Sequence, residues 1–194
     1  MVQGMADPPV QRAPRKDAAR NRSRLIEAAA RAFREQGLGV SVNAIADHAG
    51  VNVATLYRHF PTKDHLIVAV LEAVLEPLVT ARDRALMTHE SGDALATFVH
   101  EAVRLQVEHR GLADALERYP SAPELRAQLR EPAIEIVTPL VERAHRTGEL
   151  RPDVDALDLL VVLRMLAGVA AAPELSPDRV RRYVDLVLHG LRPD

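Results

Sequence analysis

The chain of 194 residues has no cysteine and no tryptophan, and it has only three phenylalanines and three tyrosines. Without cysteine, it can form neither a disulfide framework nor a thiolate metal site. The few aromatic side chains offer little flat surface for stacking. A chain of this length can still bury a sizeable apolar core without disulfides or metals.

Long hydrophobic runs are also missing. No segment reaches the roughly eighteen uninterrupted apolar residues of a membrane span, and the opening MVQGMADPPVQRAPRKD has no apolar run of the kind found in secretory signals. We therefore expect a soluble, cytoplasmic protein without membrane contact. No strand pattern or internal repeat is found, and the helical periodicities predict an all-α fold with about nine helices.

The sequence lacks the motifs of common enzyme classes. It has no glycine-rich phosphate loop and no H-E-x-x-H motif, and the nearest approach, at His100 and Glu101, has no second histidine one turn on. The eight histidines are scattered, with no two spaced four apart on one expected helix. We expect no catalytic residues, no metal site and no cofactor.

Charge is distributed unevenly along the chain. Residues 1–64 hold ten Lys/Arg against six Asp/Glu, whereas the remaining residues hold fifteen against twenty-one. A basic module joined to a non-basic one is typical of nucleic-acid-binding proteins. Residues 1–20, with several prolines and few large apolar groups, are expected to form a disordered basic arm. Such an arm is either a solvated tail or a segment that orders along phosphates.

The stretch from Ser41 to Leu66 has the pattern of a helix-turn-helix followed by a longer helix. Ser41 and Asn52 are both good N-caps, because their side chains accept from first-turn amides that have no helical partner. Gly50 lies where the first helix must end, and a left-handed residue there is least costly without a Cβ. The second helix is predicted over about 53–59, a length and position suited to the DNA major groove.

A small apolar core should hold this unit rigid. A preceding helix over about 23–36 places Ile26 and Phe33 on one face. These side chains are expected to pack on Ile45, Leu56 and Phe60, which repeat a four-residue spacing.

The run IADHAGVNVATLYRHFPTKDHL, preceded by RSRLIEAAARAFREQGLGVSV, resembles the N-terminal domain of the tetracycline-repressor (TetR) family of bacterial transcriptional regulators. The resemblance covers roughly 23–66, and it is strongest at Ala46, Gly50, Val51, Leu56, Tyr57, His59, Phe60 and Lys63. It implies a three-helix DNA-binding domain over 21–66. A continuous helix then joins this domain to a helical ligand-binding and dimerisation domain over 67–194.

The resemblance also implies which residues contact double-stranded DNA. The reading surface corresponds to Asn43, Val53, Ala54, Thr55, Tyr57, Arg58 and His59, and the phosphate-holding positions are Ser41, Tyr57, His59 and Lys63. Val53 and Ala54 offer only apolar contact, so direct readout falls on Thr55, Arg58 and Asn43. Structural alternatives remain open: Tyr57 could complete the core, and His59 and Lys63 could be ordinary surface residues.

Pro61 ends the second helix of the helix-turn-helix, which is the recognition helix. Thr62 caps the helix that follows, and Lys63 stands at its start. A cation at a helix start opposes the helix dipole, so we interpret Lys63 as a partner of an external phosphate. The helix that follows, predicted over 63–87 with a bend at Pro77, is the rigid link between the two domains.

Two later helices predict a homodimer. The segment 153–172 is apolar on every side and the segment 177–191 has one apolar stripe, so together they suit a four-helix interface with a second copy. A symmetric dimer would read a palindrome. Arg164 is the lone charge inside the apolar run of the first segment, and a buried guanidinium needs a carboxylate or several carbonyls. We expect such a partner across the interface or at a helix end, or else an anionic ligand.

Candidate ligand residues come from the helix predicted over 93–109. Its apolar side includes Phe98 and Ala102, and it also carries Gln106 and His109, which either bond within the core or face a cavity. With Arg164, these residues form the candidate site for a small apolar or amphipathic ligand, which the family resemblance implies. A further helical region over 124–147 is expected to be interrupted by Pro132 and Pro139.

The most complete interpretation is a ligand-responsive repressor that binds a palindromic operator as a dimer. An alternative is a DNA-binding regulator whose C-terminal domain only dimerises or docks a protein, without a small ligand. Whether the protein represses or activates depends on where its operator lies, which the sequence does not encode.

Overall fold

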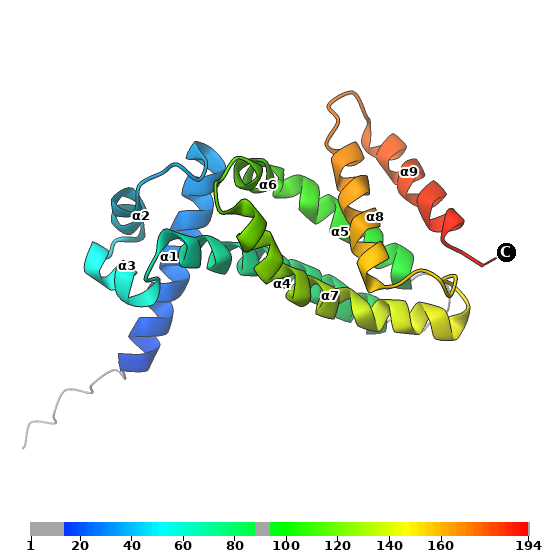
Figure 1. The fold of residues 1–194 in the computed structure, drawn as a ribbon, viewed down its shortest axis with the longest axis horizontal. Helices are drawn as coiled ribbons and strands as arrows, with labels where there is room; N and C mark the ends of the chain where they lie inside the picture. The colour runs from blue at the N-terminus through cyan, green and yellow to red at the C-terminus, as the bar shows by residue number, and fades with distance from the viewer. Residues whose placement is uncertain (1–13, 88–93, 194) are drawn as a thin grey trace, which may run out of the picture.

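The computed structural model describes residues 14–87 and 94–193, and in these ranges all of the regular secondary structure is helical (Figure 1). Within these ranges, no helix is both long and apolar enough to span a bilayer. The nine helices confirm the all-α prediction. They are α1 Pro14–Gln36, α2 Val42–Ala49, α3 Val53–His59, α4 Lys63–Met87, α5 Ala94–Glu108, α6 Arg110–Glu117, α7 Ala122–Thr147, α8 Ala156–Ala170 and α9 Pro177–Gly190.

The local signals around the helix-turn-helix are confirmed. The Ser41 hydroxyl accepts from the Ala44 N–H at 3.1 Å, and the Asn52 side-chain oxygen accepts from the Thr55 N–H at 2.7 Å. Gly50 closes α2 with φ of 65°, in the left-handed region. These caps satisfy amides and carbonyls that a short helix leaves without partners.

The first helix is longer than expected. Helix α1 begins at Pro14, so residues 14–20 are helical, and the expectation of a disordered arm is wrong for them. Proline is well tolerated at the first helical position, and Asp17 in the first turn interacts favourably with the helix dipole. The remainder of the expected arm, residues 1–13, lies outside the described residues.

The prolines do not interrupt the later helices. Helix α7 runs through Pro132 and Pro139, and α4 runs through Pro77. Each proline of α7 leaves one carbonyl four residues earlier without its helical donor. Those carbonyls belong to Gln128 and Glu135, which are exposed residues of α7.

The buried side chains form two clusters. The first joins α1, α2 and α3 to the beginning of α4, and it also includes α6 and the first turn of α7. The second lies among the remaining part of α4 and helices α5, α7, α8 and α9. Helix α4 contributes to both clusters, and Figure 1 shows α1–α3 at one end of the molecule and α8–α9 at the other.

The first cluster should determine the stability of the N-terminal unit. Phe33 is fully buried, so Phe33→Ala is expected to lower the free energy of unfolding by about 3–5 kcal/mol. Urea denaturation followed by circular dichroism measures the change. The exposed Arg31 on the same helix provides the control, since Arg31→Ala should change stability by less than about 0.5 kcal/mol. Equal losses for the two variants would contradict the assignment of this core.

Candidate nucleic-acid interface and helical-bundle cavity

Helix α3 buries one side and exposes the other. Leu56 is fully buried and Phe60, at its C-cap, is 2% exposed. On the other side, Ala54, Tyr57 and Arg58 are exposed. The helix is therefore held by its apolar side while its opposite side can contact another molecule.

The predicted reading residues differ in how far they are exposed. Tyr57 is 47% exposed, so its ring does not complete the core, which was the alternative interpretation. Asn43 on α2 is also exposed, whereas Val53 and Thr55 are half-buried and Val53 packs against the first cluster. Ser41 is exposed, but its hydroxyl already caps α2.

Lys63 has a partner inside the protein that the sequence did not indicate. Its ammonium donates a hydrogen bond to the Val40 carbonyl at 2.6 Å, and the side chain is partly buried. Burial lowers the pKa of Lys63, while the neighbouring Asp64 raises it. Because an ammonium has three donors, this bond leaves two for a phosphate.

His59 is less available than predicted. Its Nε2 is buried and has no hydrogen-bond partner among the described residues. The ring lines a hollow between α3, α4 and α7 and lies beside Phe60, over which the Arg22 guanidinium stacks at 5.4 Å from the ring centroid. A DNA contact from His59 would have to use its other ring nitrogen.

Sequence reasoning did not single out Arg24. The side chain of this α1 residue lies against Gly50 in the turn of the helix-turn-helix. A Cβ atom added to Gly50 would be only 2.7 Å from the Arg24 Nη2 atom. The available signal was the cationic series along α1, but the sequence alone did not indicate which member meets the turn. The structure thus places a guanidinium close to the α2–α3 junction.

Three of the five candidate ligand residues line one cavity. Gln106, His109 and Arg164 border a space of about 490 Å³ among α4, α5, α6, α7 and α8. The Nδ1 atom of His109 is buried without a hydrogen-bond partner among the described residues. Burial and the nearby Arg34 lower the pKa of His109, and Glu108 opposes them. Of the two interpretations, the cavity-facing one fits His109.

The other two candidates do not line this cavity. Phe98 and Ala102 are 1% and 0% exposed and lie within the second apolar cluster. Their position on the apolar side of α5 was predicted correctly, but that side packs against the bundle. A helical period identifies a buried face without showing whether it meets side chains or a space.

The expected burial of Arg164 is wrong, although the expected carboxylate exists. The side chain is 69% exposed, and its Nη2 donates to Glu117 Oε1 at 2.9 Å. Arg126 Nη1 lies 2.7 Å from the same oxygen. Glu117 was not among the predicted residues, because nothing in the sequence placed the end of α6 beside α7 and α8.

Helix α6 is shared between the cavity and the N-terminal unit. Leu112 and Leu116 line the cavity and also belong to the first apolar cluster, together with residues of α1. Gly111 lies against α1, where an added Cβ would be 4.0 Å from the Arg34 carbonyl. A displacement of α6 would therefore change its packing against α1.

Comparisons with known proteins agree with these features. The sequence model described as "Bacterial regulatory proteins, tetR family" matches residues 25–70. A second model, "Transcriptional regulator SbtR-like, C-terminal domain", matches residues 90–193. The two matches fall on the helix-turn-helix and on the helical bundle.

Individual proteins are similar over different lengths. The HTH-type transcriptional repressor KstR2 of Rhodococcus jostii is 28% identical, over 88% of this chain and 90% of its own length. The HTH-type transcriptional regulator SAR2658 of Staphylococcus aureus is 30% identical, over 53% of this chain and only 57% of its own length. A solved structure of a TetR transcription regulatory protein from Mycobacterium vanbaalenii is 33% identical, covers 93% of this chain and all of that chain, and has a TM-score of 0.60.

The cap of α3 provides a test of how this surface is held. Asn52→Ala removes the acceptor of the Thr55 N–H, and we expect it to lower the free energy of unfolding by about 1 kcal/mol. Asn52→Ser keeps a capping oxygen and should lose much less. Thermal or urea denaturation of the two variants measures the difference. Equal destabilisation by alanine and serine would contradict the capping role.

Proposed function

Because the chain belongs to the TetR family of bacterial transcriptional regulators, which are not enzymes, we propose that it is a ligand-responsive repressor that binds a palindromic operator as a homodimer. The observation that carries the proposal is the presentation of α3. Its apolar side is anchored by Leu56, and Ala54, Tyr57 and Arg58 face outward. The cytoplasm is its proposed location, where bacterial DNA lies.

In this proposal α3 enters the major groove and its exposed residues meet base edges. Arg58 can reach guanine and Asn43 can pair with adenine, while Ala54 offers a methyl contact to thymine. Thr55 is half-buried, so it would contact a base only with its exposed atoms. Ser41, Tyr57, His59 and Lys63 are proposed to hold phosphates, with Lys63 using the donors that Val40 does not occupy.

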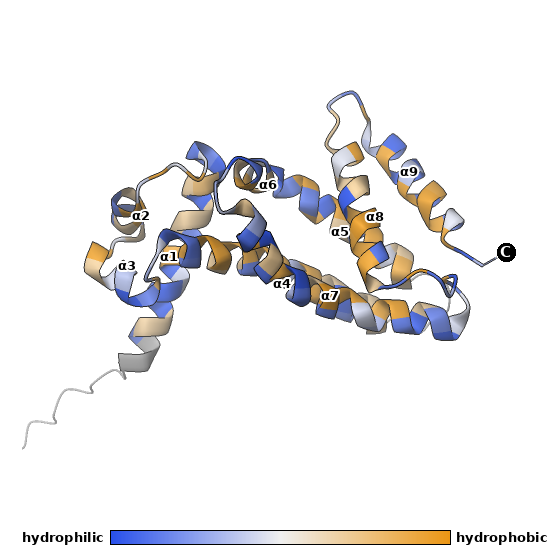
Figure 2. Ribbon diagram, viewed as in Figure 1, coloured by the Kyte–Doolittle hydropathy of each residue, from blue (hydrophilic) through white to orange (hydrophobic). Residues whose placement is uncertain are grey.

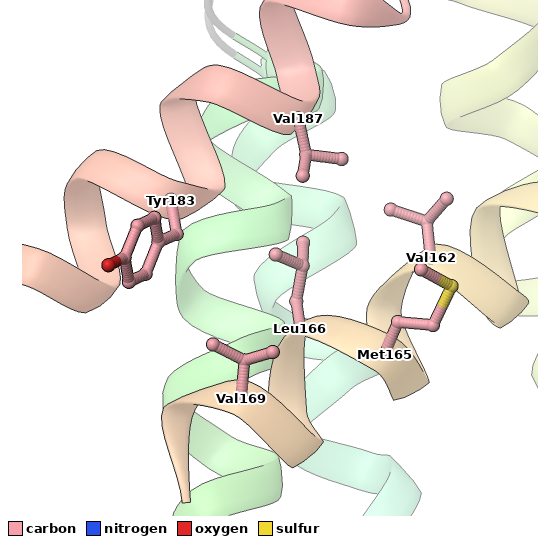
Figure 3. A pocket seen from close by; sticks show the side chains of 6 residues that line it. All are labelled: Val162, Met165, Leu166, Val169, Tyr183 and Val187. Atoms are coloured by element: carbon pink, nitrogen blue, oxygen red, sulfur yellow. The ribbon is translucent and has the colours of Figure 1, made fainter. Parts of the chain in front are cut away.

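Dimerisation is proposed through α8 and α9. Large apolar side chains that are exposed on α8 are Leu157, Val161, Met165 and Val169. Figure 2 shows hydrophobic residues along both helices, and Figure 3 shows side chains from α8 and α9 around a shallow space of about 320 Å³. An exposed apolar surface of this kind marks an interaction site. In a two-fold dimer the same surface of a second copy would cover it.

A ligand response is proposed through the cavity and α6. A ligand in contact with Leu112 and Leu116 would displace α6, which also packs on α1. Such a ligand would favour dimers whose recognition helices do not match the half-site spacing. The size of the effect is limited by the difference in the ligand's affinity for the two states. The repressor role is supported by the name of the Rhodococcus jostii relative.

Two substitutions separate phosphate contacts from base contacts. Selection of bound fragments from genomic DNA would first identify the operator. Lys63→Ala should then weaken binding about equally on operator and unrelated DNA and lower the salt slope by about 2, because each of the two subunits loses one phosphate contact. Thr55→Ala should instead change the preferred sequence. A Lys63→Ala protein with an unchanged salt slope would contradict the phosphate assignment.

The dimer surface is tested by placing charge on exposed apolar side chains of α8, with the exposed Met87 as the control site. Met165 on α8 is 64% exposed and Met87 at the end of α4 is 75% exposed. Val161→Glu/Met165→Glu should raise the dimer dissociation constant by at least about 100-fold, because burying unpaired charge is costly. Met87→Glu should leave the dimer intact. Sedimentation velocity at micromolar concentration gives the result, and dimers of equal affinity for both proteins would overturn the proposed surface.

A further inference from the structure

We propose that the cavity among α4–α8 binds an organic anion with an apolar body, whose negatively charged group binds the guanidinium groups of Arg164 and Arg126 beside or in place of Glu117. This inference rests on the cavity being the ligand site of the proposed function. It adds the chemical class of the ligand and the residues that select it.

The apolar part of the ligand is indicated by the walls of the cavity. Leu71 and Val74 of α4 face the space together with Leu112 and Leu116 of α6. Helix α8 and its C-cap contribute small residues, Ala167, Gly168 and Ala171, which leave room between the helices. A volume of about 490 Å³ lies within the range of pockets that enclose small organic molecules.

The charge of the ligand is indicated by the ionic groups at the border. Three arginines and two carboxylates line the cavity. Arg110 is engaged locally, since it donates to the Ala171 carbonyl and lies 3.4 Å from Asp114. Arg126 and Arg164 are left to share one carboxylate oxygen of Glu117. One negative charge between two guanidinium groups leaves a net positive site, which a second anion would neutralise.

The guanidinium group of Arg164 is open to a ligand, whereas Nη1 of Arg126, which lies beside Glu117, is buried. Arg126, Glu117 and Arg164 have side chains that are 33%, 52% and 69% exposed. Ion pairs in such exposed positions contribute little to stability, so displacing Glu117 costs little. A guanidinium has five N–H donors in a planar fork, and it binds carboxylates and phosphates through two parallel hydrogen bonds. Each arginine therefore has donors left for a ligand anion.

His109 provides a further polar contact and disfavours a cationic ligand. Its buried Nδ1 has no hydrogen-bond partner among the described residues and lies in a side chain that lines the cavity. Burial and Arg34 lower the pKa of the His109 ring, which favours the uncharged imidazole. A neutral imidazole can hydrogen-bond a polar group of the ligand. The same surroundings penalise a positive charge placed beside it.

Three linear eight-carbon probes that differ in their polar end group test the charge preference. Octanoate, octanamide and octylammonium are titrated into the full-length protein, and calorimetry measures each affinity. We expect octanoate to bind at least about 10-fold more tightly than octanamide, as a charge-assisted contact requires, and octylammonium to bind weakest. Equal affinities, a preference for octylammonium, or no binding of octanoate would overturn the inference.

Two variants at the ionic cluster should change octanoate affinity in opposite directions. Arg164→Gln should weaken octanoate binding by about 10-fold and leave octanamide unaffected. Glu117→Gln should strengthen octanoate binding, because it frees both guanidinium groups. Arg146→Gln, at an exposed site on α7, is the matched control and should change neither. Circular dichroism checks that each variant is folded, and an unchanged octanoate affinity in folded Arg164→Gln would contradict the assignment.

DNA binding distinguishes this inference from the proposed function. If octanoate binds as described but the affinity for the operator is unchanged when the protein is saturated with octanoate, the assigned ligand class is supported and ligand-responsive repression is contradicted. If octanoate does not bind but the protein still recognises its operator as a dimer, the anion assignment fails and the DNA-binding part of the proposed function stands.

Discussion

Helix α3 has only seven residues, too few to be stable alone in water, so its position depends on the burial of Leu56 and Phe60. These two side chains join the cluster that α1, α2 and α4 form around Phe33. The exposed side of α3 is rigid only because the buried side is held in this way. Any contact that this surface makes with another molecule therefore depends on the apolar core behind α3.

That core does not end with the helix-turn-helix. Leu112 and Leu116 of α6 belong to it, and they also form a wall of the cavity in the bundle. The hydrogen bond from the Tyr119 hydroxyl to Asp64, at 2.8 Å, adds a polar link between the α6–α7 connection and the start of α4. Well-packed cores transmit displacements because they have little free space. Helix α6 thus provides a direct mechanical connection between the two parts of the chain.

The arginines that border the cavity and the arginine on α3 have different surroundings. Arg58 stands among exposed residues of a short helix, where water surrounds it. Arg126 and Arg164 instead converge on Glu117 from different helices beside an apolar space. One carboxylate serves two guanidinium groups there, and the anion site proposed for the bundle is therefore separate from the proposed phosphate contacts of the N-terminal unit.

The sequence by itself determined the all-helical fold and the limits of α2, α3 and α4, because caps such as Ser41, Asn52 and Gly50 act within a few residues. It also singled out Gln106, His109 and Arg164 as polar residues within apolar stretches of the sequence, although the Arg164 side chain is exposed. Only the tertiary structure decided that these three residues line one cavity and that Phe98 and Ala102 do not. It also decided that Glu117 pairs with Arg164, which lies 47 residues further along the chain. Periodicity shows which face of a helix is buried, but the neighbour that buries it is chosen by packing between segments far apart in the chain.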